Sequence, residues 1–153
     1  MRKSKINISG FKIGTAENRE GLTGVTVILA PDGGATAGVD VRGCAPGTRE
    51  TDLLDPRKTV QKIHAVVLSG GSAFGLEAAS GCVKYLAEQG VGFPIGNVCV
   101  PIVCSAVLFD LMIGDEKAYP DLLMGYEAAK SASSEFLSGC NGAGTVSYTH
   151  LTL

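Results

Sequence analysis

A buried strand runs directly into a helix in this chain, through a turn of very small residues, and that junction limits the folds open to it. Residues 65–68 are apolar, a helical pattern of apolar residues occupies 73–89, and the turn between them reads Ser69-Gly70-Gly71-Ser72. Such a junction can hold a phosphate at the helix N-terminus, expose a nucleophile, or let two backbones pack closely. Each alternative requires particular residues at defined positions.

The phosphate and nucleophile alternatives each lack a residue that their chemistry needs. Gly70 and Gly75 have the spacing of a phosphate-binding loop, but Leu76 and the residue after it stand where lysine and serine or threonine are required. In a nucleophile elbow around Ser72, Phe74 replaces the glycine that the sharp turn requires. We therefore interpret Ser72 as the N-cap of the helix, accepting hydrogen bonds from its first free N–H groups.

The close-packing alternative remains. It has two forms, and the residues alone do not distinguish between them. In one form, backbone N–H groups of the turn line a binding site and orient the carbonyl or carboxylate of a substrate. In the other form, the turn is only a tight joint between strand and helix. The candidate substrate-binding residues of this turn are Ser69, Gly70, Gly71 and Ser72.

The rest of the chain predicts a mixed α/β (α+β) sandwich, because strands precede helices and a hairpin comes first. Residues 22–30 and 35–41 read as an antiparallel hairpin around the turn at 31–34, and 62–68 as a second buried strand. Between them, 42–57 is a loop with a short helical turn capped by Thr48 or Thr51. The predicted helices cover 73–89, ending at Gly90, and 121–137, with Phe136 on its apolar side. Residues 94–101 are extended or turned, and 138–145 form a glycine-rich turn.

Composition excludes several classes of partner and site. The 153 residues fit one domain, and a net charge of −2 without a basic stripe argues against nucleic acid. No segment reads as a signal peptide or membrane helix, so we expect a soluble, cytoplasmic protein without a membrane partner. Five cysteines without a CxxC pair and two histidines predict no metal and no cofactor. His64 is interpreted as a strand residue.

Several blocks of sequence together resemble peptidase family S58. These are GLTGVTVIL, GATAGVDVRGCAPGTRETDLLDP, VVLSGGSAFGLEAASG, VPIVCSAVLFDL and GAGT, in order from residue 22 to residue 145. This family comprises the P1 peptidases, that is, the L-aminopeptidase/D-esterase and β-peptidyl aminopeptidase group. The resemblance implies a four-layer αββα sandwich of the N-terminal-nucleophile-like, self-cleaving type, incomplete here. Residues 1–145 would be the N-terminal (α-subunit) part, and 146–153 a non-native tail.

The resemblance also implies roles for residues of this chain. The nucleophile would be a serine or threonine beyond the chain, exposed by self-cleavage, with its own α-amino group as base. Asn141 is the candidate oxyanion donor, although direct register places Cys140 at the family's asparagine position and Asn141 one residue late. Phe109 falls near the place of a tyrosine hydroxyl that some members use. Arg42 and Arg49 would lie at the rim of the substrate pocket, or Arg49 would belong to a solvated turn with Glu50 and Asp52.

We therefore predict the N-terminal fragment of an aminopeptidase that acts on small peptides or on amino-acid amides and esters. Its full-length form would be a homo-oligomer of self-cleaved two-chain units. The fragment alone should be inactive, and insoluble or oligomeric because an apolar face is left uncovered. Two alternatives stay open: a self-cleaving acyltransferase of the ornithine acetyltransferase type, and a non-catalytic domain that binds a small molecule or anion at the helix N-terminus at Ser72.

Overall fold

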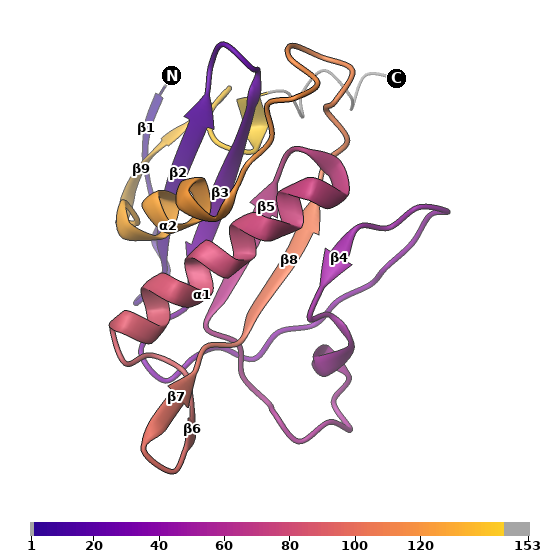
Figure 1. Cartoon of the computed structure of the whole chain (residues 1–153). Coiled ribbons are helices and arrows are strands. Elements are labelled where there is room, and N and C mark those ends of the chain that lie inside the picture. The colour runs from indigo at the N-terminus through magenta and orange to yellow at the C-terminus, as the bar shows by residue number, and fades with distance from the viewer. Residues whose placement is uncertain (1, 146–153) are drawn as a thin grey trace.

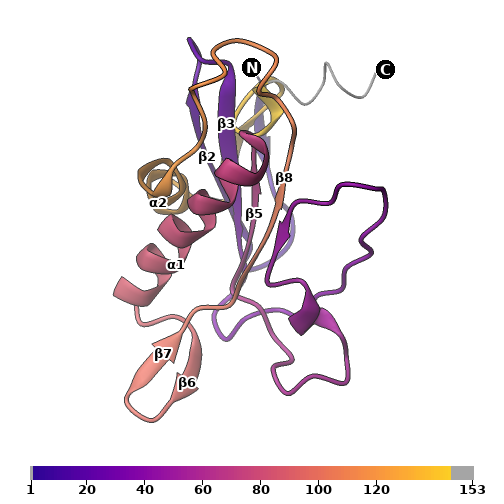
Figure 2. The same cartoon turned by 45° about the vertical axis from the view of Figure 1, so that its right-hand side comes forward.

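The computed structural model describes residues 2–145, built around a mixed five-stranded sheet in the order β2-β3-β5-β8-β4. β5 and β8 run parallel, and the other neighbouring pairs in this sheet are antiparallel. Two helices lie next to each other over one face of the sheet (Figure 1 and Figure 2). These elements are β2 (Lys12–Asn18), β3 (Thr23–Leu29), β4 (Thr48–Arg49), β5 (Ala65–Ser69), β8 (Val103–Val107), α1 (Ala78–Glu88) and α2 (Leu122–Lys130). The mixed α/β class predicted from the sequence is confirmed.

The core lies between this sheet and the two helices. Alternate residues of β3 point toward the helices, since side chains alternate between the faces of a strand. Val25 and Val27 are fully buried there, together with Val67 of β5. From the helices, the buried side chains are small: Ala78, Ala79 and Cys82 of α1, and Ala128 and Ala129 of α2.

Glycines let the helices and the sheet approach to backbone contact. A Cβ added at Gly81 of α1 would collide with the Leu122 carbonyl oxygen of α2. A Cβ added at Gly125 of α2 would meet the Ala78 carbonyl in the same way. The small residues that follow the Ser69–Ser72 turn therefore serve close helix packing, which was the third of the alternatives considered from the sequence.

The predicted hairpin between residues 22–30 and 35–41 is wrong in its second strand. β3 pairs with β2 along one edge and with β5 along the other, so neither edge is left for residues 35–41. That segment makes a single bridge, between Ala35 and Ile63, and it exposes Val39 and Val41. The true partner, β2, has the mixed sequence KIGTAEN, which carries no clear apolar alternation.

The second predicted helix is shorter than expected. α2 begins after Asp121, whose side chain accepts a hydrogen bond from the Met124 N–H at 2.8 Å, and it ends at Lys130. Ser133 then exchanges backbone hydrogen bonds with Ile13 of β2. Phe136 lies in β9 (Glu135–Ser138), which pairs with β1 (Arg2–Lys5), and not on a helix face. Tertiary pairing to β1 and β2 ends the helix.

The first predicted helix is present, but it begins with a tighter turn. Residues Ser72–Glu77 form the 3₁₀ helix η2, which leads into α1, and Gly90 follows the helix with a left-handed φ of 69°. The short helical turn predicted in the 42–57 loop is η1 (Asp52–Leu54). Side-chain capping by Thr48 or Thr51 is wrong, because Thr48 lies in β4 and the Thr51 side chain makes no capping bond.

A two-stranded hairpin, β6 (Phe93–Ile95) and β7 (Val98–Val100), projects from the end of the molecule opposite residues 138–145 (Figure 1). Gly96 has a φ of 58° in its two-residue turn, as a type II′ turn requires at its first central position. Within residues 2–145, no helix combines the length and apolar character needed to cross a membrane. The predicted tail, 146–153, lies outside the described residues.

Candidate functional site

The Ser69–Ser72 turn lies at the end of β5 and uses its N–H groups inside the protein. The Gly70 N–H donates to the Gly24 carbonyl at 2.9 Å, and the Ser72 N–H donates to the Leu108 carbonyl at 2.9 Å. The Gly71 N–H donates to Asp110 Oδ1 at 2.6 Å. The turn therefore has none of these three N–H groups free for a substrate carbonyl, and its assignment to substrate binding stays a prediction.

Asp110 is a buried carboxyl group that joins this turn to β3. It is 5% exposed, and its Oδ2 accepts the Thr23 hydroxyl at 2.8 Å while Oδ1 accepts the Gly71 N–H. A Cβ at Gly70 would collide with both Asp110 Oδ2 and Thr23 Oγ1. Glycine at position 70 is thus required by the close approach of the carboxyl group.

Ser72 is not the N-cap that the sequence suggested. Gly71 is the N-cap of η2, no side chain caps the helix, and Ser72 itself has a left-handed φ of 52°. The turn continues into Phe74, whose ring stacks on Tyr119 with centroids 4.7 Å apart. Phe74 is 58% exposed, so an aromatic surface lies beside the turn.

The two arginines predicted at the pocket rim have different surroundings. Arg49, in β4, donates from Nη1 to Ser80 Oγ at 2.7 Å and also reaches the Leu76 carbonyl at 3.5 Å. It is thereby held against α1, and the alternative of a solvated turn is wrong for this residue. Arg42 lies in an exposed loop and pairs with Asp40 at 2.6 Å. The two guanidinium groups thus have separate partners, Ser80 for Arg49 and Asp40 for Arg42.

Asn141 is buried and its amide is turned toward β2. With its nitrogen toward Glu17, the amide donates to Oε1 at 3.1 Å and Oε2 at 2.5 Å, and its oxygen accepts the Thr15 hydroxyl at 2.6 Å. This orientation satisfies every partner, whereas the opposite one sets the amide oxygen against a carboxylate. The Gly142 N–H also donates to Glu17 Oε2, at 2.9 Å. The amide is held by two side chains of β2, and its oxyanion role stays a prediction.

Two further positions from the family comparison are exposed. Cys140, which the resemblance would place at the family's asparagine position, is exposed, and Phe109 is 54% exposed. Ala143, in the same turn as Asn141, is buried, and its N–H donates to Thr26 Oγ1 at 3.1 Å. The turn therefore directs residue 140 outward and residues 141 and 143 onto the β2–β3 face.

His64 is buried in a bend immediately before β5 (Ala65–Ser69), so its interpretation as a strand residue is wrong by one position, and the strand expected over 62–68 begins at Ala65. His64 Nδ1 accepts the Ile102 N–H at 3.0 Å. Burial lowers the pKa of His64 below its usual value. Among the cysteines, burial raises the pKa of Cys82 to about 12, which leaves this thiol without nucleophilic character. Within residues 2–145, no three His, Cys, Asp or Glu side chains converge to hold a metal ion.

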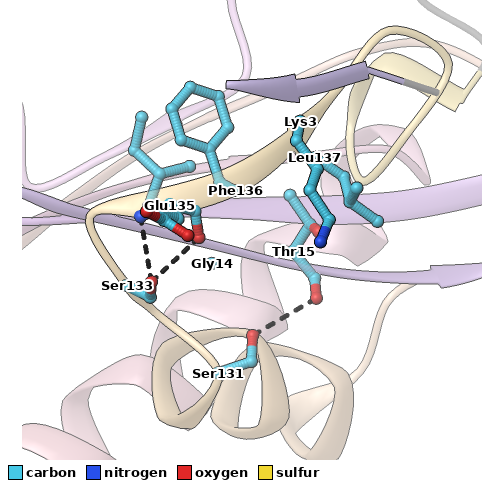
Figure 3. Close-up of a pocket in the computed structure, with 9 residues that line it drawn as sticks. Lys3, Gly14, Thr15, Ser131, Ser133, Glu135, Phe136 and Leu137 are labelled. Atoms are coloured by element: carbon cyan, nitrogen blue, oxygen red, sulfur yellow. Dashed lines mark hydrogen bonds between the residues drawn. The ribbon is translucent and has the colours of Figure 1, made fainter. Parts of the chain in front are cut away.

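A pocket of about 510 Å³ opens between β2 and the β1–β9 pair (Figure 3). Thr15 lies in its wall, and the Ser131 hydroxyl donates to the Thr15 carbonyl at 3.4 Å. The pocket contains none of the residues predicted to bind substrate, but Thr15 connects it to the Asn141 amide. The lining residues are Lys3, Ile13, Gly14, Thr15, Ser131, Ser133, Glu135, Phe136 and Leu137.

Sequence reasoning missed the three residues that organise both turns: Thr15, Glu17 and Asp110. Thr15 and Glu17 lie on β2, a strand that the apolar pattern did not reveal. Asp110 follows β8 by three residues and ends its apolar run, and a carboxyl group at the end of such a run was a signal that could have identified it.

The same mixed α/β fold is found in two solved structures. A protein from Pyrococcus horikoshii OT3 matches with a TM-score of 0.71 and 22% identity, over 90% of this chain and 43% of that one. A β-aminopeptidase from Burkholderia sp. matches with a TM-score of 0.65 and 18% identity, over 90% of this chain and 41% of that one.

The model of peptidase family S58 matches residues 5–151, and the chain belongs to that family. An uncharacterized aminopeptidase of Mycobacterium tuberculosis (strain H37Rv) is 47% identical over 121 residues, which cover 79% of this chain and 35% of the relative. A 6-aminohexanoate-oligomer endohydrolase of Paenarthrobacter ureafaciens is 36% identical over 141 residues, 92% of this chain and 37% of that enzyme. The resemblance seen in the sequence is confirmed, and the chain spans little more than a third of the length of these relatives.

Proposed function

We propose that this chain is the N-terminal part of a self-processing aminopeptidase that hydrolyses small peptides, amino-acid amides or esters. The observation that carries the proposal is the family match across residues 5–151, supported by 47% identity to a relative named as an aminopeptidase. The 6-aminohexanoate-oligomer endohydrolase among the relatives is in keeping with amide substrates. Cleavage would pass through an acyl-enzyme on a serine or threonine supplied by the remainder of a family-length chain.

In this proposal the described residues form walls of the substrate site and hold those walls in place. The nucleophile's own α-amino group acts as base, so His64, buried and bonded to the Ile102 N–H, is not required. Asn141 is the oxyanion donor in this proposal, and to act as one its amide nitrogen exchanges a hydrogen bond to the Glu17 carboxylate for one to the substrate oxygen. The 153 residues alone are inactive. The same proposal includes small substrates, a cytoplasmic location and a homo-oligomer of two-chain units. It includes no nucleic-acid or membrane partner.

A chimera tests the proposal directly. Residues 2–145 of this chain replace the matching segment of the M. tuberculosis relative, so that the remainder of the relative supplies the rest of the family-length chain. The expected result is self-cleavage into two chains, seen by mass spectrometry, together with release of p-nitroaniline from amino-acid p-nitroanilides. The isolated 153-residue chain, assayed in parallel, should show neither.

Two outcomes would count against the proposal. Hydrolysis by the isolated chain at the rate of the chimera would show that the remainder is unnecessary. An intact chimera that transfers an acetyl group to ornithine faster than it hydrolyses amides would assign the chain to acyl transfer instead.

A further inference from the structure

We infer that Asp110 is a positioning residue for the Ser69–Ser72 wall of the substrate site, an inference that rests on the proposed function. Its two carboxyl oxygens hold two turns that are distant in the sequence. Oδ1 accepts the Gly71 N–H at 2.6 Å, after β5, and Oδ2 accepts the Thr23 hydroxyl at 2.8 Å, at the start of β3. A buried carboxyl group with two such partners fixes the relative position of both turns.

Each of these donors is preceded or followed by a strained residue. Leu22, before Thr23, has a φ of 54°, and Ser72, after Gly71, has a φ of 52°. Left-handed backbone is unfavourable for residues with a Cβ, and it persists only where surrounding contacts impose it. The two hydrogen bonds of Asp110 are contacts of that kind, one at each strained turn.

The neighbouring glycines make the space for this arrangement. A Cβ at Gly70 would strike Asp110 Oδ2, and a Cβ at Gly75 would strike the Gly70 carbonyl oxygen. The chain just before Asp110 also pairs with the turn, because the Leu108 N–H donates to the Ser69 carbonyl at 2.8 Å and the Ser72 N–H donates back to the Leu108 carbonyl. Asp110 is thus the side-chain part of a continuous connection between residues 69–72 and 108–110.

This connection determines which groups of the Ser69–Ser72 wall are available to contact a substrate. The N–H groups of Gly70, Gly71 and Ser72 are all bonded inside the protein. The half-buried Ser72 and the exposed Phe74 ring, stacked on Tyr119, remain as the contact groups of the turn. Asp110 itself is buried and acts through them, so we assign this wall to contact with an apolar substrate group and not to an oxyanion. Such contacts act equally on substrate and transition state.

The chimera described above measures this role through KM and kcat. D110A should raise KM by roughly tenfold or more and leave kcat within about twofold, as expected for loss of uniform binding. D110N should stay close to the parent, because its amide oxygen still accepts the Gly71 N–H and its nitrogen can donate to Thr23 Oγ1. D115A is the matched control on the same loop, since among residues 2–145 the Asp115 carboxyl accepts a local hydrogen bond alone, from the Lys117 N–H at 2.9 Å.

Three results would overturn the inference: D110A kinetics equal to those of D115A, a fall in kcat without a rise in KM, or D110N as impaired as D110A. A parent chimera without activity would refute the proposed function. The positioning role of Asp110 would then be tested by a second measurement, made on the 153-residue chain itself. There, hydrogen exchange at the Gly71 amide should accelerate in D110A and not in D110N or D115A. Unchanged exchange in D110A would overturn the inference independently of activity.

Discussion

The Glu17 carboxylate accepts the Gly142 N–H at 2.9 Å, and this bond ties β2, near the start of the chain, to the turn that carries the candidate oxyanion residue. The Asn141 amide donates to the same carboxylate. One acidic side chain therefore satisfies two polar groups of a turn whose residues 141 and 143 are buried. Side chains of β2 therefore hold this turn in place.

Replacing Glu17 should loosen this turn. E17A leaves the Gly142 N–H and the Asn141 amide without their acceptor and should lower the free energy of unfolding by about 1–3 kcal/mol. Urea unfolding, with hydrogen exchange of residues 139–145, would measure the loss. E20A, an exposed glutamate on the following turn, is the control. Equal stability of E17A and E20A would contradict the assignment.

Gly81 should resist substitution although it lies inside a helix. Alanine normally stabilises a helix interior by about 1 kcal/mol relative to glycine. At Gly81 the added methyl group meets the Leu122 carbonyl, so G81A should instead destabilise the chain by about 1 kcal/mol or more. G38A is the control, because no atom of the described part of the chain lies within 4 Å of the Cβ position at Gly38. A G81A protein that melts above the parent would show that α1 and α2 are not in backbone contact.

The β6–β7 hairpin should promote self-association of the isolated chain. Register and alternation put Phe93, Ile95, Val98 and Val100 on one face, and Ile95 and Val98 are 56% and 64% exposed. V98K should therefore reduce association, because a charge on this apolar face opposes its burial. Sedimentation velocity would compare it with N97K, which adds the same charge in the turn. If both variants associate like the parent, the hairpin face is not responsible.

His64 should make stability depend on pH. Burial lowers its pKa in the folded chain, so the unfolded chain binds a proton more readily below about pH 6.5. The contribution of neutral His64 to stability is thus present above pH 6.5 and is lost as the pH falls toward the folded-state pKa. H64N, whose amide oxygen can replace Nδ1 as acceptor for the Ile102 N–H, should flatten this dependence between pH 8 and pH 5. Unfolding curves with the same slope in both proteins would refute it.

The local elements were predictable where the pattern of the chain is strong. β3 and β5 are apolar runs with β-branched residues, and α1 has helical spacing with a terminating glycine, so short-range preference and burial agree. β2 and the end of α2 were not predictable in this way. The sequence KIGTAEN is a strand because it pairs with β3, and residues 135–138 leave the helix because they pair with β1.

The features of the candidate site also fall into two groups, those predictable from the sequence and those that depend on tertiary contacts. The sequence alone predicts the glycines of the Ser69–Ser72 turn, the asparagine of the last turn and the membership of peptidase family S58. Each of these depends on residue identity and spacing along the chain. Which N–H groups are occupied, and by which carboxyl group, depends on contacts between residues 39 and 125 positions apart. Asp110 and Glu17 acquire their roles only when packing brings strand ends together. A buried donor takes the nearest acceptor in space, whatever the separation in sequence.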